Sequence, residues 1–524
     1  MIRSRKKAWL SMSALLLAAC LVVAGCGSNN GKGGASGGAA NTNEPAANQP
    51  AANTPANEPA DEQPAASDLK PYTVTLRYPG SEQEDEKKVE EAMNKILTEK
   101  INATIDIQPI DWGAWEDKLN LMFSSGEKSD IVFTASWQGY GLNVAKGGFL
   151  PLDDLLKQHG KEILETLNPA FLEAAQIGGK TYAIATNKEL GSHAGVIMRK
   201  DLIDKHKLDV SNVKTMADLE PLLQTIKDKE PQVTPFYVME SIMPAQFFAD
   251  VDAAGDVTAP GVVSKTGTET TFKEQFEMPE FVNDVKLTHK WLKNGLVNKD
   301  AATTKTLPEE MLKAGKIFAY ASPLKPGKDK EVESATGVPL IQVDITKPVV
   351  TTGDATGSML AISKTSADPE RAMMVINLLH SDKELLNLLV FGIENVHYKK
   401  VSDNVIENLD RDSYNPGNNW MMGDQFLNYL GSNEDPEKWE KFKAYNDSVV
   451  KSPVLGFLFN ADPVKNELAQ IANVNKQYFN AIVSGGVDPD KYIPEYLDKL
   501  KKAGSEKVIA EKQRQFDEFM ASKK

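Results

Sequence analysis

The 524-residue sequence has only two cysteines, Cys20 and Cys26, and both lie in the first 26 residues. The rest of the chain therefore cannot form a disulfide, bind zinc through thiolates or use a cysteine nucleophile. Its fold must depend on packing alone. Histidine is also scarce, since the six histidines form neither a His-Glu-x-x-His motif nor a close cluster. A zinc hydrolase has no support, and we expect neither a catalytic metal nor a cofactor.

One segment has a partial resemblance to a calcium loop. Residues 250–256 carry three aspartates at spacing partly suited to calcium. Ala254, however, stands where an EF-hand needs a ligand, and no glutamate closes the loop. An ordinary polar loop is the favoured interpretation.

Motifs of enzymes and of nucleic-acid-binding proteins are missing as well. From residue 70 onward the chain has no Gly-x-Ser-x-Gly sequence, and no Gly-x-x-x-x-Gly-Lys-Ser/Thr sequence occurs anywhere in it. Carboxylate pairs such as Asp153-Asp154 and Glu309-Glu310 are adjacent, which is typical of helix N-termini, whereas a glycosidase needs two opposed carboxylates. The net charge is −14, and no basic stripe carries interleaved aromatic residues. We therefore expect a protein that is not an enzyme and binds no nucleic acid.

The N-terminus has the features of a bacterial export signal. Residues 1–7 carry four positive charges, and the apolar stretch 8–23 is too short for a comfortable membrane span. It ends in Val-Ala-Gly-Cys26, which resembles the lipobox, where the cysteine is lipidated and becomes the first mature residue. We predict a lipoprotein signal peptide at 1–25 and a lipid anchor at Cys26 on the outer face of the cytoplasmic membrane. An uncleaved anchor would also hold the protein outside this membrane.

The segment after this cysteine is poor in large apolar residues as far as Leu69 and is rich in Gly, Ser, Pro, Ala and Asn. Such a composition cannot form a core. We predict that residues 26–69 comprise the lipidated cysteine and a flexible tether.

The body of the chain has the patterning of an α/β protein. Apolar residues alternate over 72–78, follow a helical stripe over 84–100 and alternate again over 101–107. This βαβ unit predicts a parallel sheet. Further strands are expected at 130–134, 181–186, 196–199, 316–320 and 360–363, with helices at 115–123, 215–228, 279–294 and 369–380. Beyond Asp382 strand signals fade, and helices at 383–390, 435–451, 463–483, 490–502 and 506–522 predict a helical C-terminal subdomain.

Aromatic residues follow several of the expected strands. Trp112 follows the second strand, Trp137 and Tyr140 follow the strand at 130–134, and Trp420 lies in a Pro-Gly-Asn-Asn loop. Ligand sites in open α/β sheets lie at the carboxyl ends of strands. An aromatic ring can stack on the C–H face of a pyranose, while carboxylates and amides bind its hydroxyls. These loops suit an oligosaccharide, although a lone tryptophan in this position is as often a core or loop anchor.

A series of short motifs runs through about residues 70–520. They are IDWG at 110–113, NVAKGGFLPLD at 143–153, GKTYAI at 179–184, MRKDL at 198–202, GSMLAIS at 357–363, FGIENVHY at 391–398, GDQF at 423–426 and SPVLGF at 452–457. In this order they resemble the family 1 extracellular solute-binding proteins of ABC importers, the maltose-binding-protein-like group. The resemblance is closer to a lipoprotein subgroup with a distinctive C-terminal domain.

This resemblance implies a two-lobed, type II periplasmic-binding-protein fold that holds an oligosaccharide between its lobes by hinge closure. It implies lobe 1 at 70–190, lobe 2 at 191–350, a crossover and return segment at 351–400, and a helix-rich region at 401–524 that completes the lobes. The closed form would be recognised by the membrane subunits of an ABC permease, powered by a separate ATPase. We expect a monomer.

The resemblance also implies site residues. The loops of Trp112, Trp137 and Tyr140 correspond to first-lobe ligand loops. Glu189 lies near a crossover position where related sugar binders place a carboxylate, a position that Ser192 or His193 could occupy instead. The second-lobe or hinge-side candidates are Tyr237, Tyr320, Asp354 and Trp420.

Two alternatives keep the same fold. One is a receptor for a peptide or a charged metabolite, which arginine or lysine side chains converging on the cleft would favour. The other is a sensor that docks on a membrane receptor when its ligand is bound.

Overall fold

The computed structural model of the chain describes residues 69–240, 242–254 and 259–523. The predicted signal peptide at 1–25 and the predicted tether at 26–69, apart from its last residue, lie outside these ranges. None of the helices in the described ranges is long and apolar enough to span a bilayer. Within the same ranges, no three His, Cys, Asp or Glu side chains are grouped so that they could hold a metal ion.

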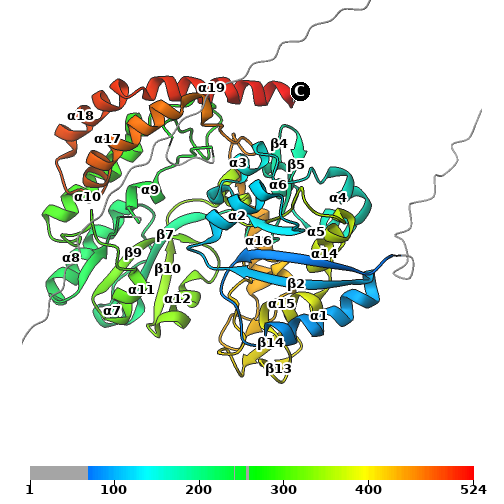
Figure 1. Cartoon of the computed structure of the whole chain (residues 1–524). Coiled ribbons are helices and arrows are strands. Elements are labelled where there is room, and N and C mark those ends of the chain that lie inside the picture. The colour runs from blue at the N-terminus through cyan, green and yellow to red at the C-terminus, as the bar shows by residue number, and fades with distance from the viewer. Residues whose placement is uncertain (1–68, 241, 255–258, 524) are drawn as a thin grey trace, which may run out of the picture. The chain divides into compact units, whose positions relative to one another are not determined.

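The first half of the fold, in which Figure 1 labels β2 and α1, contains a five-stranded sheet in the order β2-β1-β3-β12-β6. Its strands are β1 (Tyr72–Pro79), β2 (Ala103–Ile110), β3 (Ile131–Thr134), β6 (Ala183–Ala185) and β12 (Met359–Ile362). β1 pairs in parallel with both β2 and β3, whereas β12 is antiparallel to β3 and β6. The predicted βαβ unit and its parallel pairing are therefore confirmed, but the sheet as a whole is mixed.

The helix of this unit, α1 (Glu86–Ile101), buries the predicted apolar stripe through Val89, Met93 and Leu97. One boundary was wrong. Ile101 belongs to the helix and not to the following strand, because Asn102 adopts a left-handed conformation (φ 46°) that ends the helix. The other helices and short strands associated with this sheet before residue 190 are α2 (Trp115–Ser125), α3 (Tyr140–Ala145), α4 (Asp153–His159), α5 (Lys161–Thr166), α6 (Pro169–Ala174), β4 (Gln176–Ile177) and β5 (Lys180–Thr181).

The second half is a four-stranded sheet in the order β10-β7-β9-β8. Its strands are β7 (His193–Arg199), β8 (Thr234–Tyr237), β9 (Ile317–Leu324) and β10 (Leu340–Asp344). Its helices are α7 (Lys200–His206), α8 (Glu220–Lys229), α9 (Pro244–Phe248), α10 (Pro279–Lys293), α11 (Pro308–Lys313) and α12 (Lys328–Thr336). The helix expected at 215–228 begins with a 3₁₀ turn, and Asp218 accepts a hydrogen bond from the backbone N–H of Thr215 in a capping box.

Each sheet has its own core, and the chain passes between them three times. One buried cluster takes residues from 74–190 and 350–455, and the other takes residues from 194–321 and 464–508. We call the two halves lobe 1 and lobe 2. The crossings are 186–192, 345–358 and 449–464. The second crossing contains β11 (Val349–Val350), which pairs in parallel with β16 (Val450–Lys451) of the third, and α13 (Thr352–Ala355). The two-lobed α/β fold is confirmed.

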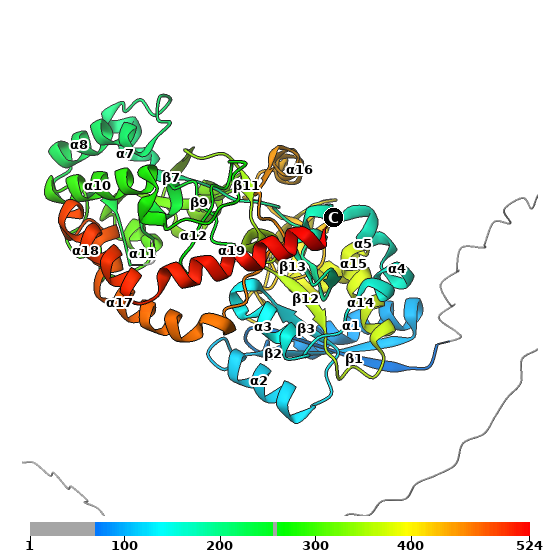
Figure 2. The ribbon, with the colours of Figure 1, turned by 90° about the horizontal axis from the view of Figure 1, so that it is seen from above.

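The C-terminal part is mostly helical, as expected. Its helices are α14 (Pro369–Ser381), α15 (Lys383–Phe391), α16 (Lys438–Ser448), α17 (Lys465–Val483), α18 (Pro489–Lys502) and α19 (Ser505–Ser522). Figure 2 shows the last three side by side. The expectation that strands end at Asp382 was wrong, since a small sheet contains β13 (Tyr398–Ser402), β14 (Val405–Asn408) and β15 (Leu430–Gly431). Most side chains of β13 and β14 are polar or exposed, so no apolar alternation reveals them.

A substitution at Gly195 of β7 tests how closely the strands of the second sheet are packed. A Cβ at this position would lie 2.2 Å from the carbonyl oxygen of Val343 in β10 and 2.4 Å from Cδ1 of Leu324 in β9. We expect Gly195→Ala to lower the free energy of unfolding by about 1–3 kcal/mol, because the neighbouring strands must move. Gly141→Ala is the control, since no atom lies within 4 Å of that Cβ. Urea unfolding checks this, and equal midpoints for the two variants would contradict it.

Candidate ligand-binding cleft

Three tryptophans gather at the carboxyl edge of the first sheet. Trp112 follows β2, Trp137 follows β3, and Trp420 comes from the long loop between β14 and β15. The ring centroid of Trp112 lies 6.1 Å from that of Trp137 and 6.3 Å from that of Trp420, with interplanar angles of 21° and 11°. We call these three residues the aromatic cluster. Trp112 is 47 % exposed and Trp137 is 53 % exposed, so the cluster presents apolar ring surface to solvent, which is typical of a binding surface.

The aromatic cluster is held by the second crossing. The indole Nε1 of Trp137 donates a hydrogen bond to the carbonyl oxygen of Gly357 at 2.8 Å. Ser358 donates from its Oγ to the carbonyl oxygen of Trp420 at 2.9 Å. These bonds fix both the ring of Trp137 and the backbone of the Trp420 loop relative to the segment that joins the lobes.

Gly357 also lines a cavity of about 500 Å³. Its walls come from the first crossing, the second crossing and the end of β9, and they include Glu189, Ser192, Tyr320, Lys325 and Asp354. We call it the central cavity. The sequence candidates Glu189, Tyr320 and Asp354 thus lie together, next to the residue that binds Trp137.

Glu189 is the charged centre of this cavity. Its Oε1 lies 3.2 Å from Nζ of Lys188 and 3.7 Å from Nζ of Lys325. Burial alone would raise the pKa of Glu189, but the two ammonium groups outweigh it and lower the pKa to about 2. Its Oε2 is buried and accepts no hydrogen bond from another described residue. The carboxylate is ionised at neutral pH, and one of its oxygens is buried without a hydrogen-bond donor from the described residues.

Tyr320 and Asp354 have different surroundings. Tyr320 is 2 % exposed, and burial together with the Glu309 carboxylate raises the pKa of its hydroxyl, which stays neutral. Asp354 is engaged within the protein: its Oδ2 accepts from the backbone N–H of Thr351 at 3.0 Å, and its Oδ1 accepts from Ser192 Oγ at 2.9 Å. Asp354 therefore caps α13 and joins the first crossing to the second.

The remaining sequence candidates lie outside the cleft. Tyr140 is fully buried in lobe 1 and donates to the carbonyl oxygen of Ala175 at 2.6 Å. Tyr237 is 2 % exposed and donates to the carbonyl oxygen of Thr306 at 2.9 Å. His193, the alternative to Glu189, is buried with its Nδ1 3.0 Å from the hydroxyl of Tyr445. Each ring packs in a core, so we leave all three out of the ligand site proposed below.

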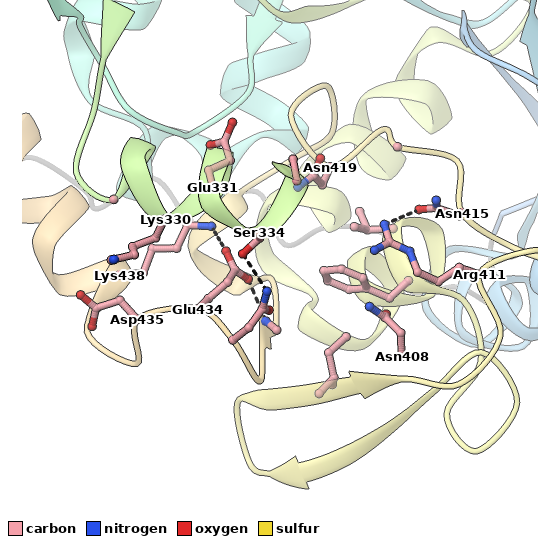
Figure 3. Close-up of a pocket in the computed structure, with 18 of the residues that line it drawn as sticks. Lys330, Glu331, Ser334, Asn408, Arg411, Asn415, Asn419, Glu434, Asp435 and Lys438 are labelled. Atoms are coloured by element: carbon pink, nitrogen blue, oxygen red, sulfur yellow. Dashed lines mark hydrogen bonds and ion pairs between the residues drawn. The ribbon is translucent and has the colours of Figure 1, made fainter. Parts of the chain in front are cut away.

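Figure 3 shows a second cavity, of about 430 Å³. It shares the lining residue Lys325 with the central cavity. It lies between α12 and the segments around β14 and β15, and it is lined by asparagines including Asn408, Asn415, Asn418 and Asn419. The sequence analysis missed this amide-rich cavity. The loop Asn-Pro-Gly-Asn-Asn-Trp was its visible signal, but only the tryptophan was used.

Two parts of the chain match known protein families. Residues 80–384, more than half of it, match the family described as bacterial extracellular solute-binding protein. Residues 453–521 match a domain of unknown function. The chain belongs to the family of bacterial extracellular solute-binding proteins, as the motifs of the sequence indicated.

Two relatives come from Streptococcus pneumoniae. The chain is 34 % identical to a carbohydrate ABC transporter substrate-binding protein of serotype 4, strain ATCC BAA-334 / TIGR4, with 82 % of this chain and 87 % of the relative covered. A crystal structure of the N-glycan transport solute-binding protein is 31 % identical, covers 87 % of this chain and 100 % of its own, and superposes with a TM-score of 0.79. Structures of the same protein in complex with Man1GlcNAc and Man5GlcNAc, 30 % and 31 % identical, give 0.69 and 0.66, covering 86 % and 87 % of this chain and all of theirs.

More distant structures share the fold alone. One is a solute-binding protein of Bifidobacterium longum infantis described as binding human milk oligosaccharides, abbreviated HMO. It is 16 % identical, covers 86 % of this chain and 99 % of its own, and has a TM-score of 0.60. The type II architecture therefore holds well beyond the range of close sequence similarity.

The ion pairs of Glu189 make stability depend on pH. Because the folded-state pKa of about 2 is below the ordinary value of 4.5, this contribution is complete above pH 4.5 and is lost as the pH falls from 4.5 to 2. We expect Glu189→Gln to lower the free energy of unfolding by about 1–2 kcal/mol at pH 7 and by less at pH 3. Urea unfolding at both pH values measures the difference. Glu116→Gln, at an exposed position of α2, is the control. A loss of unfolding free energy in Glu189→Gln that is the same at both pH values would argue against the ion pairs.

Proposed function

We propose that this chain is a membrane-anchored substrate-binding lipoprotein of an ABC importer. It captures an oligosaccharide between its lobes and delivers it to a permease. The observation that carries this proposal is the exposed aromatic cluster near a cavity whose carboxylate, Glu189, is ionised and has one oxygen without a hydrogen-bond partner among the described residues.

The chemistry of these two features matches a sugar ring. A pyranose has apolar C–H faces and a rim of hydroxyls. Trp112 and Trp137 offer flat apolar surface for the first, and Glu189 Oε2 offers a hydrogen-bond acceptor for the second. Tyr320 contributes a neutral hydroxyl from lobe 2.

The site also explains hinge closure. The aromatic cluster belongs to lobe 1, whereas Tyr320 and Lys325 belong to lobe 2. A ligand that touches both sets of residues gains contacts only when the lobes approach each other, so binding shifts the population towards the closed form. That form is the one that a permease would recognise.

The charges of the central cavity favour a neutral ligand over a peptide or an anionic metabolite. Lys325 lies within ion-pair distance of Glu189 and Glu331, and Lys328 lies 2.6 Å from Glu331. Lys188 is also paired with Glu189. Since each of these three ammonium groups already pairs with one of two glutamate carboxylates, they are poorly suited to bind a ligand carboxylate. The carbohydrate and N-glycan descriptions of the Streptococcus pneumoniae relatives support the same choice.

The same cavity is unsuited to glycoside hydrolysis. A glycosidase needs a carboxylic acid that is protonated near neutral pH and a second, opposed carboxylate. Glu189, with a pKa of about 2, cannot supply that proton. Asp354 is occupied by Thr351 and Ser192. We therefore propose that the oligosaccharide is bound and released intact.

The aromatic cluster provides the direct test. We expect Trp112→Ala and Trp137→Ala each to weaken binding of a mannose–N-acetylglucosamine oligosaccharide by about 10–100-fold, because each removes a stacking surface worth about 1–3 kcal/mol. Calorimetric titration of the purified protein measures this. Leu164→Ala, at an exposed apolar position of α5, is the control and should leave the affinity unchanged.

Two results would count against the proposal. One is the absence of binding by the unsubstituted protein across glycans of this class. The other is an affinity that both tryptophan variants retain. Recovery of a cleaved glycan after the titration would instead support an enzyme.

The lipid anchor is tested separately. We expect Cys26→Ala to abolish incorporation of radiolabelled palmitate and to release the protein from the membrane fraction of the bacterium. Two or more acyl chains are needed for stable attachment, and this cysteine is the proposed point of attachment. Cys20→Ala is the matched control, since the proposed cleavage removes that residue. Membrane retention without any label in Cys26→Ala would favour an uncleaved anchor.

A further inference from the structure

A third cavity, of about 750 Å³, lies between the hinge and the C-terminal helices. Ser192, Gly353 and Asp354 line this cavity and also line the central cavity. The two cavities therefore meet at the crossings. The other wall comes from α17, within the segment that matches a domain of unknown function.

One face of α17 forms this wall. Ile471, Asn475 and Phe479 recur at intervals of four residues, and Lys476 and Asn480 lie beside them on the same face. Ile471 is buried in the core of lobe 2, so the helix moves with that lobe. Phe479 packs edge-on against Phe276, with ring centroids 6.1 Å apart.

The polar groups on this wall have few partners within the described protein, and those of Lys476 and Asn480 are exposed. Asn475 Oδ1 accepts a hydrogen bond from the hydroxyl of Tyr496 at 2.7 Å, which fixes its amide. The side chain of Asn480 forms no hydrogen bond with another described residue, and Lys476 forms no ion pair with one. Glu274, also in the wall, is 9 % exposed, and its buried Oε2 has no hydrogen-bond partner among the described residues.

A ring, two amides, an ammonium and a buried carboxyl around one cavity match a group with many hydroxyls. A purely apolar ligand would leave the buried Glu274 oxygen unpaired, and a phosphate or carboxylate would lie beside the carboxyl groups of Glu274 and Asp354. Sugar hydroxyls can donate to the carboxyl groups and accept from the amides and from Lys476.

We propose that α17 forms a subsite for the far residues of the oligosaccharide, whose other residues occupy the central cavity and the aromatic cluster. This inference rests on the proposed function. It gives the domain of unknown function a role: its first long helix makes the site longer, so that long glycans bind more tightly than short ones.

The test uses two ligands and a matched pair of variants. The probes are a mannose–N-acetylglucosamine disaccharide and the hexasaccharide Man5GlcNAc, titrated calorimetrically into the purified protein. Asn480→Ala and Asn473→Ala both remove an exposed asparagine side chain from α17, but only Asn480 lines the cavity. Phe479→Leu is a second cavity variant, which keeps an apolar side chain in the core.

We expect Asn480→Ala and Phe479→Leu each to weaken binding of the hexasaccharide by about fivefold or more. We expect the disaccharide affinity to change less than twofold. Asn473→Ala should change neither. Thermal unfolding of each variant verifies that the fold is kept.

The other outcomes separate this inference from the proposed function. If the unsubstituted protein binds both glycans and the cavity variants bind them equally well, the inference is wrong and the proposed function stands. Equal losses for both glycans also contradict the subsite, because they indicate an effect on the hinge. If the unsubstituted protein binds neither glycan, the proposed function fails and the inference fails with it.

Discussion

Ser192 in the first crossing donates a hydrogen bond to Asp354 in the second, and β11 of the second crossing pairs with β16 of the third. These few bonds join the only segments through which the described chain passes from one lobe to the other. Each lobe has its own sheet and its own buried core, so each can move as a unit. The mutual pairing of the crossings restricts that motion to bending at one place. A two-lobed receptor needs this constraint, because its lobes must approach each other without losing their alignment.

The ligand site is built on the same segments. Gly357 and Ser358 of the second crossing hold Trp137 and the Trp420 loop, and Glu189 of the first crossing is held by lysines on both sides. The residues proposed to touch a sugar are thus one or two contacts away from the hinge. A ligand in the central cavity acts directly on the part of the molecule that bends, so no long pathway is needed between binding and closure.

The local features of this structure were predictable from the sequence, whereas the long-range ones were not. Helix α1, its apolar stripe and the parallel pairing of β1 with β2 follow from patterns within 40 residues. Trp112 and Trp137 were found because they follow strands, and strand ends are where open α/β sheets bind ligands. Tyr140 has the same sequence context, but its position on α3 turns the ring into the core. Whether a ring after a strand faces inward depends on packing that no single segment encodes.

The cavities were also not predictable from the sequence, because residues far apart in the chain form their walls. The wall of α17 lies more than 100 residues in sequence from Ser192, Gly353 and Asp354, the hinge residues on the same cavity. The asparagines of the amide-rich cavity face α12 from another lobe. The resemblance to solute-binding proteins predicted that the chain returns to each lobe. It did not predict which helix faces would line the cleft, because polar residues on a helix usually face solvent and only the fold distinguishes a solvated face from a cavity wall.

The proposed function requires that a bound oligosaccharide brings the two lobes together. Both cysteines lie within the first 26 residues, so spin labels can be placed uniquely in a Cys20→Ala, Cys26→Ala background. Leu121→Cys in lobe 1 and Leu307→Cys in lobe 2 replace exposed side chains. Pulsed electron–electron double resonance should give a shorter and narrower distance distribution when saturating Man5GlcNAc is added. An unchanged distribution, with the glycan bound as measured by calorimetry, would contradict closure and leave a rigid sugar-binding protein.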